Sequence, residues 1–291
     1  MKTKTSLLAI FIFTIFCSCK DDIILPTQLR IESQADLDLY CDKLMETKVY
    51  QGSISFDDDA GALDLSCFQN IREVTSFLYI NSMDVASAFS NIEKVGGEGL
   101  AIGDTILESI SFENLKECSA LTFFHQTDLH EVHFPNIEYL DHLIFASSLK
   151  INKITGFHKV KTCVSINMHT PNAEINNLDI FQNLEGLTTM AIVLPAETIL
   201  SSQSFNKLER IDATGHFDKD NLGYNVSQLF PGIDSCPDLS ISNDESILDD
   251  FCYLSQSLIS KNIDIVFYPS LEASIPNVTS YDSQDIIDNC Q

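Results

Sequence analysis

Basic residues are scarce in this sequence. Only 17 Lys and Arg stand against 42 Asp and Glu among 291 residues, so the formal net charge is −25. A surface with this excess of negative charge repels the phosphates of nucleic acids and of anionic lipids. The composition therefore argues against a nucleic-acid partner and against electrostatic binding to a membrane surface.

Long apolar runs are also missing. The run from Leu7 to Phe16 has ten residues, whereas a membrane-spanning helix needs about 20. Lys2 and Lys4 precede this run, and the pattern predicts a signal peptide over residues 1–18. We expect the rest of the chain to be soluble apart from any attached lipid.

Catalytic signatures are absent as well. The sequence has no nucleophile elbow, P-loop, dinucleotide-binding glycine pattern, HExxH zinc motif or paired CxxC motif. The nearest approach to a metal cluster is His125, His130 and His133. We expect His130 and His133 in the turn that leads into Phe134, where solvated histidines are commoner than ligands. The run Asp57–Asp59 lacks the spaced ligands and the glycine of a calcium loop, although a calcium ion there is an open alternative. We expect no enzyme activity, no cofactor and no metal.

What the sequence does contain is a repeat, clearest from Phe134 to Phe145. The same frame starts at eight phenylalanines spaced 21 to 25 residues apart: Phe68, Phe89, Phe112, Phe134, Phe157, Phe181, Phe205 and Phe230. The third and sixth residues after each Phe are apolar, and in most repeats an alternating run follows, as in Leu143 and Phe145. Alternation with a period of two is typical of a half-buried strand, so each repeat is expected to supply one strand.

Stacking is the way in which such repeats bury their apolar side. We therefore predict a mainly β repeat solenoid whose parallel strands lie about 4.8 Å apart, with the phenylalanines in an internal row. The second residue after Phe is Asn in five repeats: Asn70, Asn91, Asn114, Asn136 and Asn183. We expect these amides to bond the backbone of a neighbouring repeat, with ordinary surface turns as the alternative.

The ends of the repeat region carry other patterns. Residues 34–45 place Leu37 and Leu44 on one helical face, which predicts a helix capping the first repeat, and residues 52–56 alternate as a first strand. Residues 212–220 lack alternation, so we expect a distorted repeat or a loop there. The predicted domains are a signal peptide (1–18), a lipidated tether (19–33), the solenoid with its N-terminal cap (34–248) and a C-terminal cap (249–291).

Seven cysteines follow Cys19. Cys118, Cys163 and Cys236 share one position in repeats that are not adjacent, too far apart for the roughly 7 Å limit on the Cα atoms of a disulfide. We expect these three to be free, buried thiols. The remaining cysteines predict two disulfides that staple the ends, Cys41–Cys67 and Cys252–Cys290, with reduced thiols throughout as the alternative.

The start of the chain resembles a bacterial lipoprotein signal. Ser18 precedes Cys19, which is the expected lipidation site, and Lys20-Asp21-Asp22 is similar to the acidic export signal of Bacteroidota surface lipoproteins. The resemblance implies a lipid-anchored protein of the outer membrane, facing the cell exterior or the periplasm. The alternative is an ordinary signal peptide cut elsewhere. Asp104-Thr105-Ile106 resembles the Bacteroidota acceptor for O-glycosylation, with Thr105 as the modified residue.

Residues 34–291 resemble the receptor L-domain and leucine-rich-repeat-like lipoproteins of Bacteroidota. The motifs that carry this resemblance are QADLDLY, GSISF, NIEKVGGEGLAI, LDDFCYL and the terminal DIIDNC. The resemblance implies a right-handed parallel β-solenoid with one sheet per face, and a binding or adhesion role rather than catalysis.

The strand pattern also predicts a binding face. Side chains that alternate with the buried ones point outward, and they form an uncharged, partly apolar row centred on Tyr79, Phe124, Ile144, His169 and Val193. The alternative is that small side chains simply suit a tightly stacked sheet, or that a loop covers the row. We expect a monomeric, non-catalytic surface lipoprotein that binds a protein or glycan ligand. The alternatives are a polysaccharide-acting β-solenoid enzyme and a structural surface component without a ligand.

Overall fold

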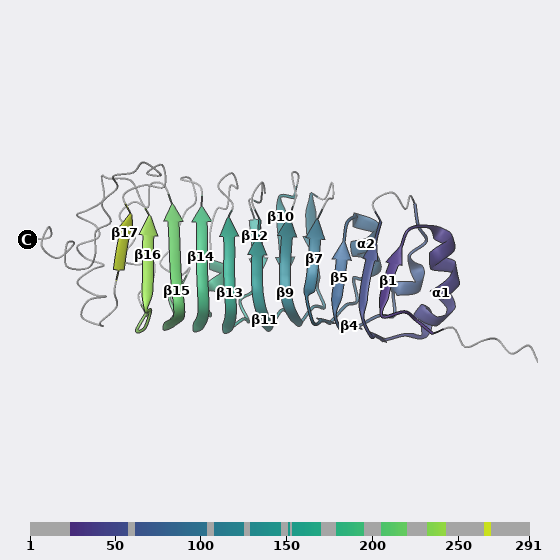
Figure 1. Ribbon diagram of the computed structural model, residues 1–291, viewed down its shortest axis with the longest axis horizontal. Coiled ribbons are helices and arrows are strands. Elements are labelled where there is room, and N and C mark those ends of the chain that lie inside the picture. The colour runs from purple at the N-terminus through teal and green to yellow at the C-terminus, as the bar shows by residue number, and fades with distance from the viewer. Residues whose placement is uncertain are drawn as a thin grey trace, which may run out of the picture.

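The computed structural model describes residues 24–57, 62–103, 108–124, 129–146, 151, 153–169, 179–194, 205–219, 232–242 and 265–268. Within these residues the protein is mainly β, with one parallel sheet of 14 strands and a second of three. Figure 1 shows the strands of the large sheet side by side along the longest axis of the molecule, with α1 at one end.

The large sheet follows the chain from one end to the other. Its strands are, in spatial order, β1 (Gln28–Ile31), β3 (Ser53–Phe56), β5 (Phe77–Ile80), β7 (Gly99–Gly103), β9 (Glu117–Phe124), β11 (Tyr139–Phe145), β13 (Thr162–His169), β14 (Gly186–Leu194), β15 (Arg210–Lys219), β16 (Asp238–Ser242) and β17 (Ile265–Tyr268). The short strands β2 (Val49–Tyr50), β4 (Glu73–Val74) and β6 (Lys94–Val95) belong to the same sheet. The second sheet holds β8 (Ser109–Ser111), β10 (Glu131–Phe134) and β12 (Lys153–Gly156).

Successive repeats place equivalent residues beside one another. Leu121, Leu143, Ile166 and Met190 are direct partners along β9, β11, β13 and β14. These residues are buried, and they are the positions that the alternating runs predicted to point inward. The predicted parallel, mainly β architecture with one strand of the large sheet from each of these repeats is therefore confirmed.

The phenylalanine that starts each repeat lies in the core. All seven described members, from Phe68 to Phe205, are at most 4% exposed. Ring centroids are 5.1 Å apart for Phe68 and Phe89, 5.7 Å for Phe112 and Phe134, and 5.6 Å for Phe134 and Phe157. Aromatic pairs at these separations attract one another beyond their simple burial. The predicted internal row is thus present over these stretches.

The five asparagines of the repeat form the predicted ladder. Each side-chain amide donates to a backbone carbonyl of the preceding segment, with N···O distances from 2.7 to 3.1 Å. The acceptors are the carbonyls of Met45, Gln69, Ser90, Glu113 and His158. Four of these carbonyls lie between strands and the fifth lies in the last turn of α1, and the amides satisfy them, which is why a short amide recurs at this position.

Helices are few and short. The predicted helix is present as α1 (Gln34–Glu46), which begins at the N-cap Ser33 and buries Leu37 and Leu44. The structure adds α2 (Met83–Ala88) and two 3-10 turns, η1 (Ser66–Phe68) and η2 (Asp179–Phe181). No helix of the described residues is long and apolar enough to cross a membrane.

The sheet extends beyond both predicted limits. Residues 28–31, which the pattern assigned to the tether, form β1 and pair with β3, and Leu29 and Ile31 are buried. At the other end, residues 265–268 lie within the predicted C-terminal cap but form β17, which pairs in parallel with β16. Two or three alternating apolar residues suffice for a strand when a neighbouring strand supplies the hydrogen bonds.

Of the two alternatives expected for residues 212–220, the distorted repeat is confirmed and the loop is wrong. Residues 210–219 form β15, the longest strand described, which pairs with β14 and β16. The pairing with β14 shifts register between Leu187 and Thr189, so that Thr189 lies opposite Thr214. This irregularity explains why period-two alternation could not be seen, because an extra residue interrupts the alternation of inward and outward side chains.

Candidate binding face

One side of the large sheet carries the outward side chains of β5, β7, β9, β11, β13 and β14. We call these residues the outer face: Phe77, Tyr79, Ala101, Gly103, Ala120, Thr122, Phe124, His142, Ile144, Ser165, Asn167, Thr189, Ala191 and Val193. Register aligns them in rows, such as Tyr79, Ala101, Thr122, Ile144, Asn167 and Ala191. Four of the five predicted binding residues lie on this face and are half-buried: Tyr79, Phe124, Ile144 and Val193.

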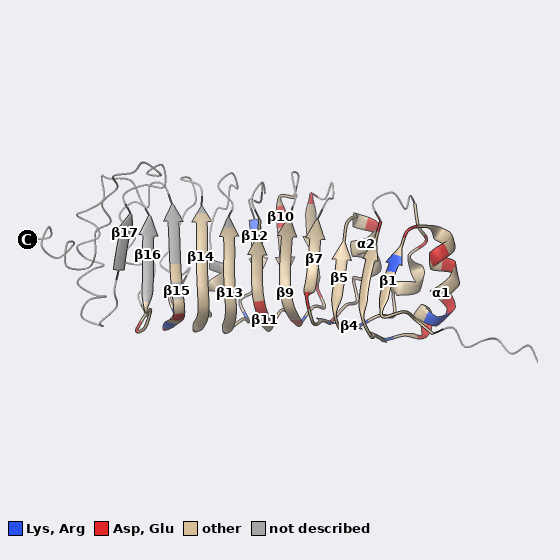
Figure 2. Ribbon diagram, viewed as in Figure 1, with Lys and Arg blue, Asp and Glu red and all other residues tan. Residues whose placement is uncertain are grey.

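The outer face holds no Asp, Glu, Lys or Arg. Its residues are Ser, Thr, Asn, Ala, Gly and His, together with Phe77, Tyr79, Phe124, Ile144 and Val193. In Figure 2 the middle of the strands from β5 to β14 is correspondingly tan. Because the chain as a whole has a net charge of −25, an uncharged face across six strands needs a separate explanation.

Charged side chains gather instead where the strands begin, and we call this side of the large sheet the charged edge. The residue before each strand is charged and its sign alternates from repeat to repeat: Arg72, Glu93, Lys116, Glu138, Lys161 and Glu185. Lys116 Nζ lies 2.9 Å from Glu93 Oε2, and Lys161 Nζ lies 3.4 Å from Glu185 Oε1. The hydrogen bond and the attraction between Lys116 and Glu93 raise the pKa of the lysine and lower that of the glutamate. These pairs are exposed, so each contributes little to stability.

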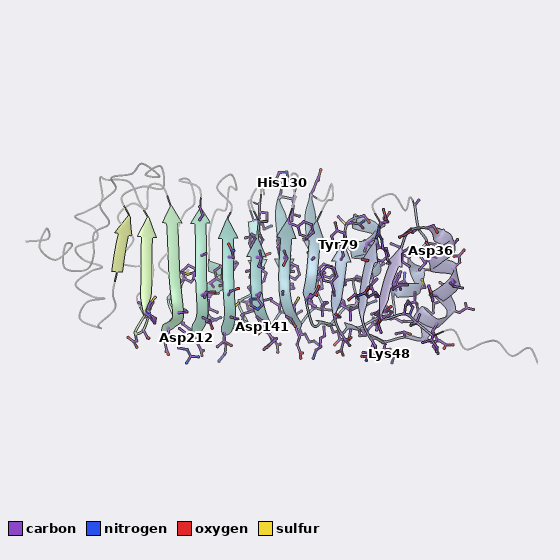
Figure 3. All side chains as sticks on the ribbon, in the orientation of Figure 1. Asp36, Lys48, Tyr79, His130, Asp141 and Asp212 are labelled. Atoms are coloured by element: carbon purple, nitrogen blue, oxygen red, sulfur yellow. The ribbon has the colours of Figure 1, made fainter. Side chains whose placement is uncertain are left out.

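Two shallow depressions lie at this charged edge. One of about 610 Å³ is lined by residues including Lys159, Lys161 and Lys207 together with Glu138 and Glu185. Lys159 and Lys207 donate to the side-chain oxygens of Asn136 and Asn183, so they continue the asparagine ladder. The other, of about 380 Å³, borders the exposed Tyr139. In Figure 3 the labelled Lys48, Asp141 and Asp212 lie along this edge, whereas Tyr79 lies within the sheet.

An aromatic pair lies on the outer face. Tyr79 of β5 and Phe124 of β9 stack with their centroids 5.9 Å apart and their planes inclined by 8°. The two strands are not neighbours, because β7 lies between them. The rings therefore meet above β7, where the outward residues are Ala101, only 6% exposed, and Gly103.

Glycine at position 103 makes this contact possible. A Cβ built there would lie 2.4 Å from Cε2 and Cζ of Phe124, far inside van der Waals contact. The ring of Phe124 thus rests directly against the backbone of β7. The sequence pattern missed this arrangement, because the glycines at 96, 97 and 99 shifted the frame of that repeat. The signal that could have found it is the pair of small residues, Ala101 and Gly103, between two strands with outward aromatics.

Histidines do not assemble a metal site in the described part of the chain. His133 Nδ1 lies 2.6 Å from Thr155 Oγ1, and its Nε2 lies 3.6 Å from Glu113 Oε1. On the outer face, His142 Nδ1 lies 2.9 Å from Ser165 Oγ. Within the described residues, no three His, Cys, Asp or Glu side chains are grouped as metal ligands would be. His125 lies outside these residues.

The cysteines at the shared repeat position are free and buried, as predicted. Cys118 Sγ donates to the carbonyl of Ala120 at 2.9 Å, and Cys163 Sγ donates to that of Ser165 at 3.2 Å. Burial raises the pKa of each thiol to about 12. The thiolate is the nucleophilic form, and a raised pKa keeps both thiols protonated at neutral pH.

Cys41 and Cys67 are neighbouring thiols at the α1 end. Burial raises the pKa of the Cys67 thiol, and a hydrogen bond with Cys41 adds to the effect. The predicted disulfide between them stays a prediction. Other predicted residues lie outside the described part of the chain: Cys19, Thr105, Cys252, Cys290 and the pair Asp58 and Asp59. For His169 the structure gives its place in β13 and its register partner Val193.

Comparison of the chain with protein-family models, with curated proteins and with solved structures found no match.

Proposed function

We propose that the repeats wind into a right-handed β-solenoid of the leucine-rich-repeat-like, receptor L-domain-like type, with α1 capping its first turn. The parallel order of the strands supports this proposal, because strands joined by parallel crossovers in one sheet are right-handed in nearly all proteins. The asparagine ladder and the buried phenylalanines add support, since both kinds of contact link one repeat to the next at recurring positions.

We propose that the protein is a non-catalytic surface lipoprotein that binds a protein or glycan ligand through the outer face. One observation carries the proposal. Although the chain is strongly acidic, the outer face has no charged side chain across six neighbouring strands, and it holds a stacked aromatic pair. Surfaces that are uncharged and partly apolar are typical of partner-binding sites. The lipid anchor at Cys19 rests on the sequence motif alone.

Binding assays with the chain from residue 20 onward test this proposal. The chain should bind at least one member of a panel of host matrix proteins and glycans. The double variant Phe124→Asp and Ile144→Asp puts two charges on the outer face, and it should abolish that binding while leaving the melting temperature nearly unchanged. Tyr139→Asp is a matched control, because Tyr139 is 53% exposed at the charged edge. Full binding by the folded double variant would move the site to another face.

A further inference from the structure

We infer that the ligand of the outer face is a neutral glycan, which packs a sugar ring on the Tyr79–Phe124 pair and bonds to the small polar side chains beside it. This inference rests on the proposed function and narrows it to one class of ligand. The platform spans β5, β7 and β9, with the two rings 5.9 Å apart above Ala101 and Gly103.

Charge is the first argument. An ionic ligand gains most where opposite charges meet it, and the outer face offers no Lys, Arg, Asp or Glu for that purpose. The rest of the chain carries a large excess of carboxylates, which repel anionic polymers approaching from solution. A neutral ligand has no such cost and needs no counter-ion on the face.

Composition is the second argument, and it separates a glycan from a protein partner. Protein interfaces are enriched in aromatic residues, Met and Arg at their centres. The outer face has neither Met nor Arg, and most of its positions hold Ser, Thr, Asn, Ala or Gly. Hydroxyl and amide side chains suit the hydroxyl groups of sugars, since each both donates and accepts hydrogen bonds. Thr122 lies on β9 in register with Ala101, and the same row continues through Ile144 to Asn167 on β13.

The fixed position of the rings is the third argument. Sugar rings present apolar C–H faces, and an aromatic ring provides an apolar surface that can pack against them. Phe124 is held against the backbone of β7 because residue 103 has no side chain. Both rings are half-buried and stacked on one another, so little side-chain freedom remains to be lost when a ligand binds.

Affinity electrophoresis with neutral polysaccharides tests the inference. The chain from residue 20 onward is run through native gels containing dextran, a β-glucan, a mannan or a galactan, and through gels containing sulfated dextran. At least one neutral polysaccharide should retard it, and sulfated dextran should not. Phe124→Ala should weaken the retardation about tenfold, which corresponds to the loss of one stacking contact. Tyr139→Ala, which removes an exposed ring at the charged edge, should leave retardation unchanged.

Two further variants keep the test independent of folding defects. Phe124→Leu retains apolar bulk but loses the flat ring, so it should keep the melting temperature and still weaken binding. Gly103→Val drives a side chain into the position of the Phe124 ring and should have the same effect on binding. Wild-type binding by both folded variants would overturn the inference.

The outcomes also separate this inference from the proposed function. Binding to a matrix protein that Phe124→Asp with Ile144→Asp abolishes, without retardation by any neutral polysaccharide, would overturn the glycan and leave the binding face standing. Retardation by sulfated dextran alone would overturn the inference and move anion binding to the lysines at the charged edge. Absence of any binding to proteins or polysaccharides would overturn both proposals.

Discussion

Phe123 and Phe124 are adjacent in the chain and face opposite sides of β9. The ring of Phe123 is fully buried and stacks on Phe145 at 4.6 Å, whereas the ring of Phe124 stacks on Tyr79 on the outer face. Their environments differ because successive side chains of a strand point to opposite faces. The same residue type therefore supports the core at one position and the candidate site at the next.

Phe134 is the residue whose truncation should damage the core most directly. Its ring has three aromatic neighbours, Phe112, Phe123 and Phe157, at centroid distances of 5.7, 6.1 and 5.6 Å. Phe134→Ala leaves a cavity among them, so we expect a loss of roughly 3–5 kcal/mol in the free energy of unfolding. Thermal and urea unfolding followed by circular dichroism measure the loss. Tyr139→Ala removes an exposed ring and should change stability by less than about 0.5 kcal/mol; equal stabilities for the two variants would contradict the buried row.

At the scale of elements, the repeats are held together by contacts that recur at fixed positions. The phenylalanines join neighbouring repeats in the core, the asparagines join their turns, and the ion pairs join them at the charged edge. Since each contact links a repeat to its neighbour, stability is expected to depend on nearest-neighbour terms. The repeat that starts at Phe68 follows α1 instead of another turn with a phenylalanine and an asparagine, and there α1 supplies the carbonyl of Met45 as the acceptor for Asn70.

The sequence predicted this element-level order better than it predicted the limits of the sheet. Apolar residues three and six positions after each Phe are all buried from Ile71 to Cys236, because a strict period leaves few other arrangements. The strand β15 was missed because its pairing with β14 shifts register between Leu187 and Thr189. The Tyr79–Phe124 contact was missed for a related reason: it joins strands that are not neighbours and depends on the small residues of β7.

The α1 end offers a test of the predicted Cys41–Cys67 disulfide. A hydrogen bond joins the two thiols, so their sulfur atoms lie near one another, and closing this loop would add roughly 3.5 kcal/mol of stability. Two thiols would lose two protons and two electrons to an oxidant such as oxidised glutathione. Because burial raises the pKa of Cys67, its thiolate is scarce at neutral pH. We therefore expect pairing to accelerate as the pH rises toward the raised pKa.

Non-reducing peptide mapping of the exported protein measures this pairing directly. The expected result is a linked peptide pair containing Cys41 and Cys67, which Cys41→Ser removes, and a melting temperature that falls on reduction. The buried Cys118 should stay unmodified by alkylating reagents in the folded protein and serves as the internal control. Complete alkylation of both Cys41 and Cys67 after unfolding without reductant would show that they remain thiols.

For the whole molecule, net charge and anchoring belong to one argument. With a formal net charge of −25, the chain cannot rely on electrostatic attraction to anionic lipids to stay at a membrane. The proposed surface lipoprotein would therefore depend on a lipid chain for lasting attachment, and the resemblance to a lipoprotein signal makes Cys19 the expected site of that chain. In this proposal, display of the outer face to ligands outside the cell further requires export, and Lys20-Asp21-Asp22 is the expected signal for it.

Location is the prediction that tests this arrangement. The wild-type protein should be found in the outer-membrane fraction of the producing cells, and external protease should remove it from intact cells. Cys19→Ala should release it from the membrane fraction, because the protein then has neither a lipid nor a favourable charge to hold it. Cys17→Ala is the matched control and should leave it anchored.

Replacement of Lys20-Asp21-Asp22 by alanines should keep the protein in the membrane fraction but protect it from external protease. Protection of the wild-type protein in intact cells would place the binding face in the periplasm, and its ligand would then have to be sought there.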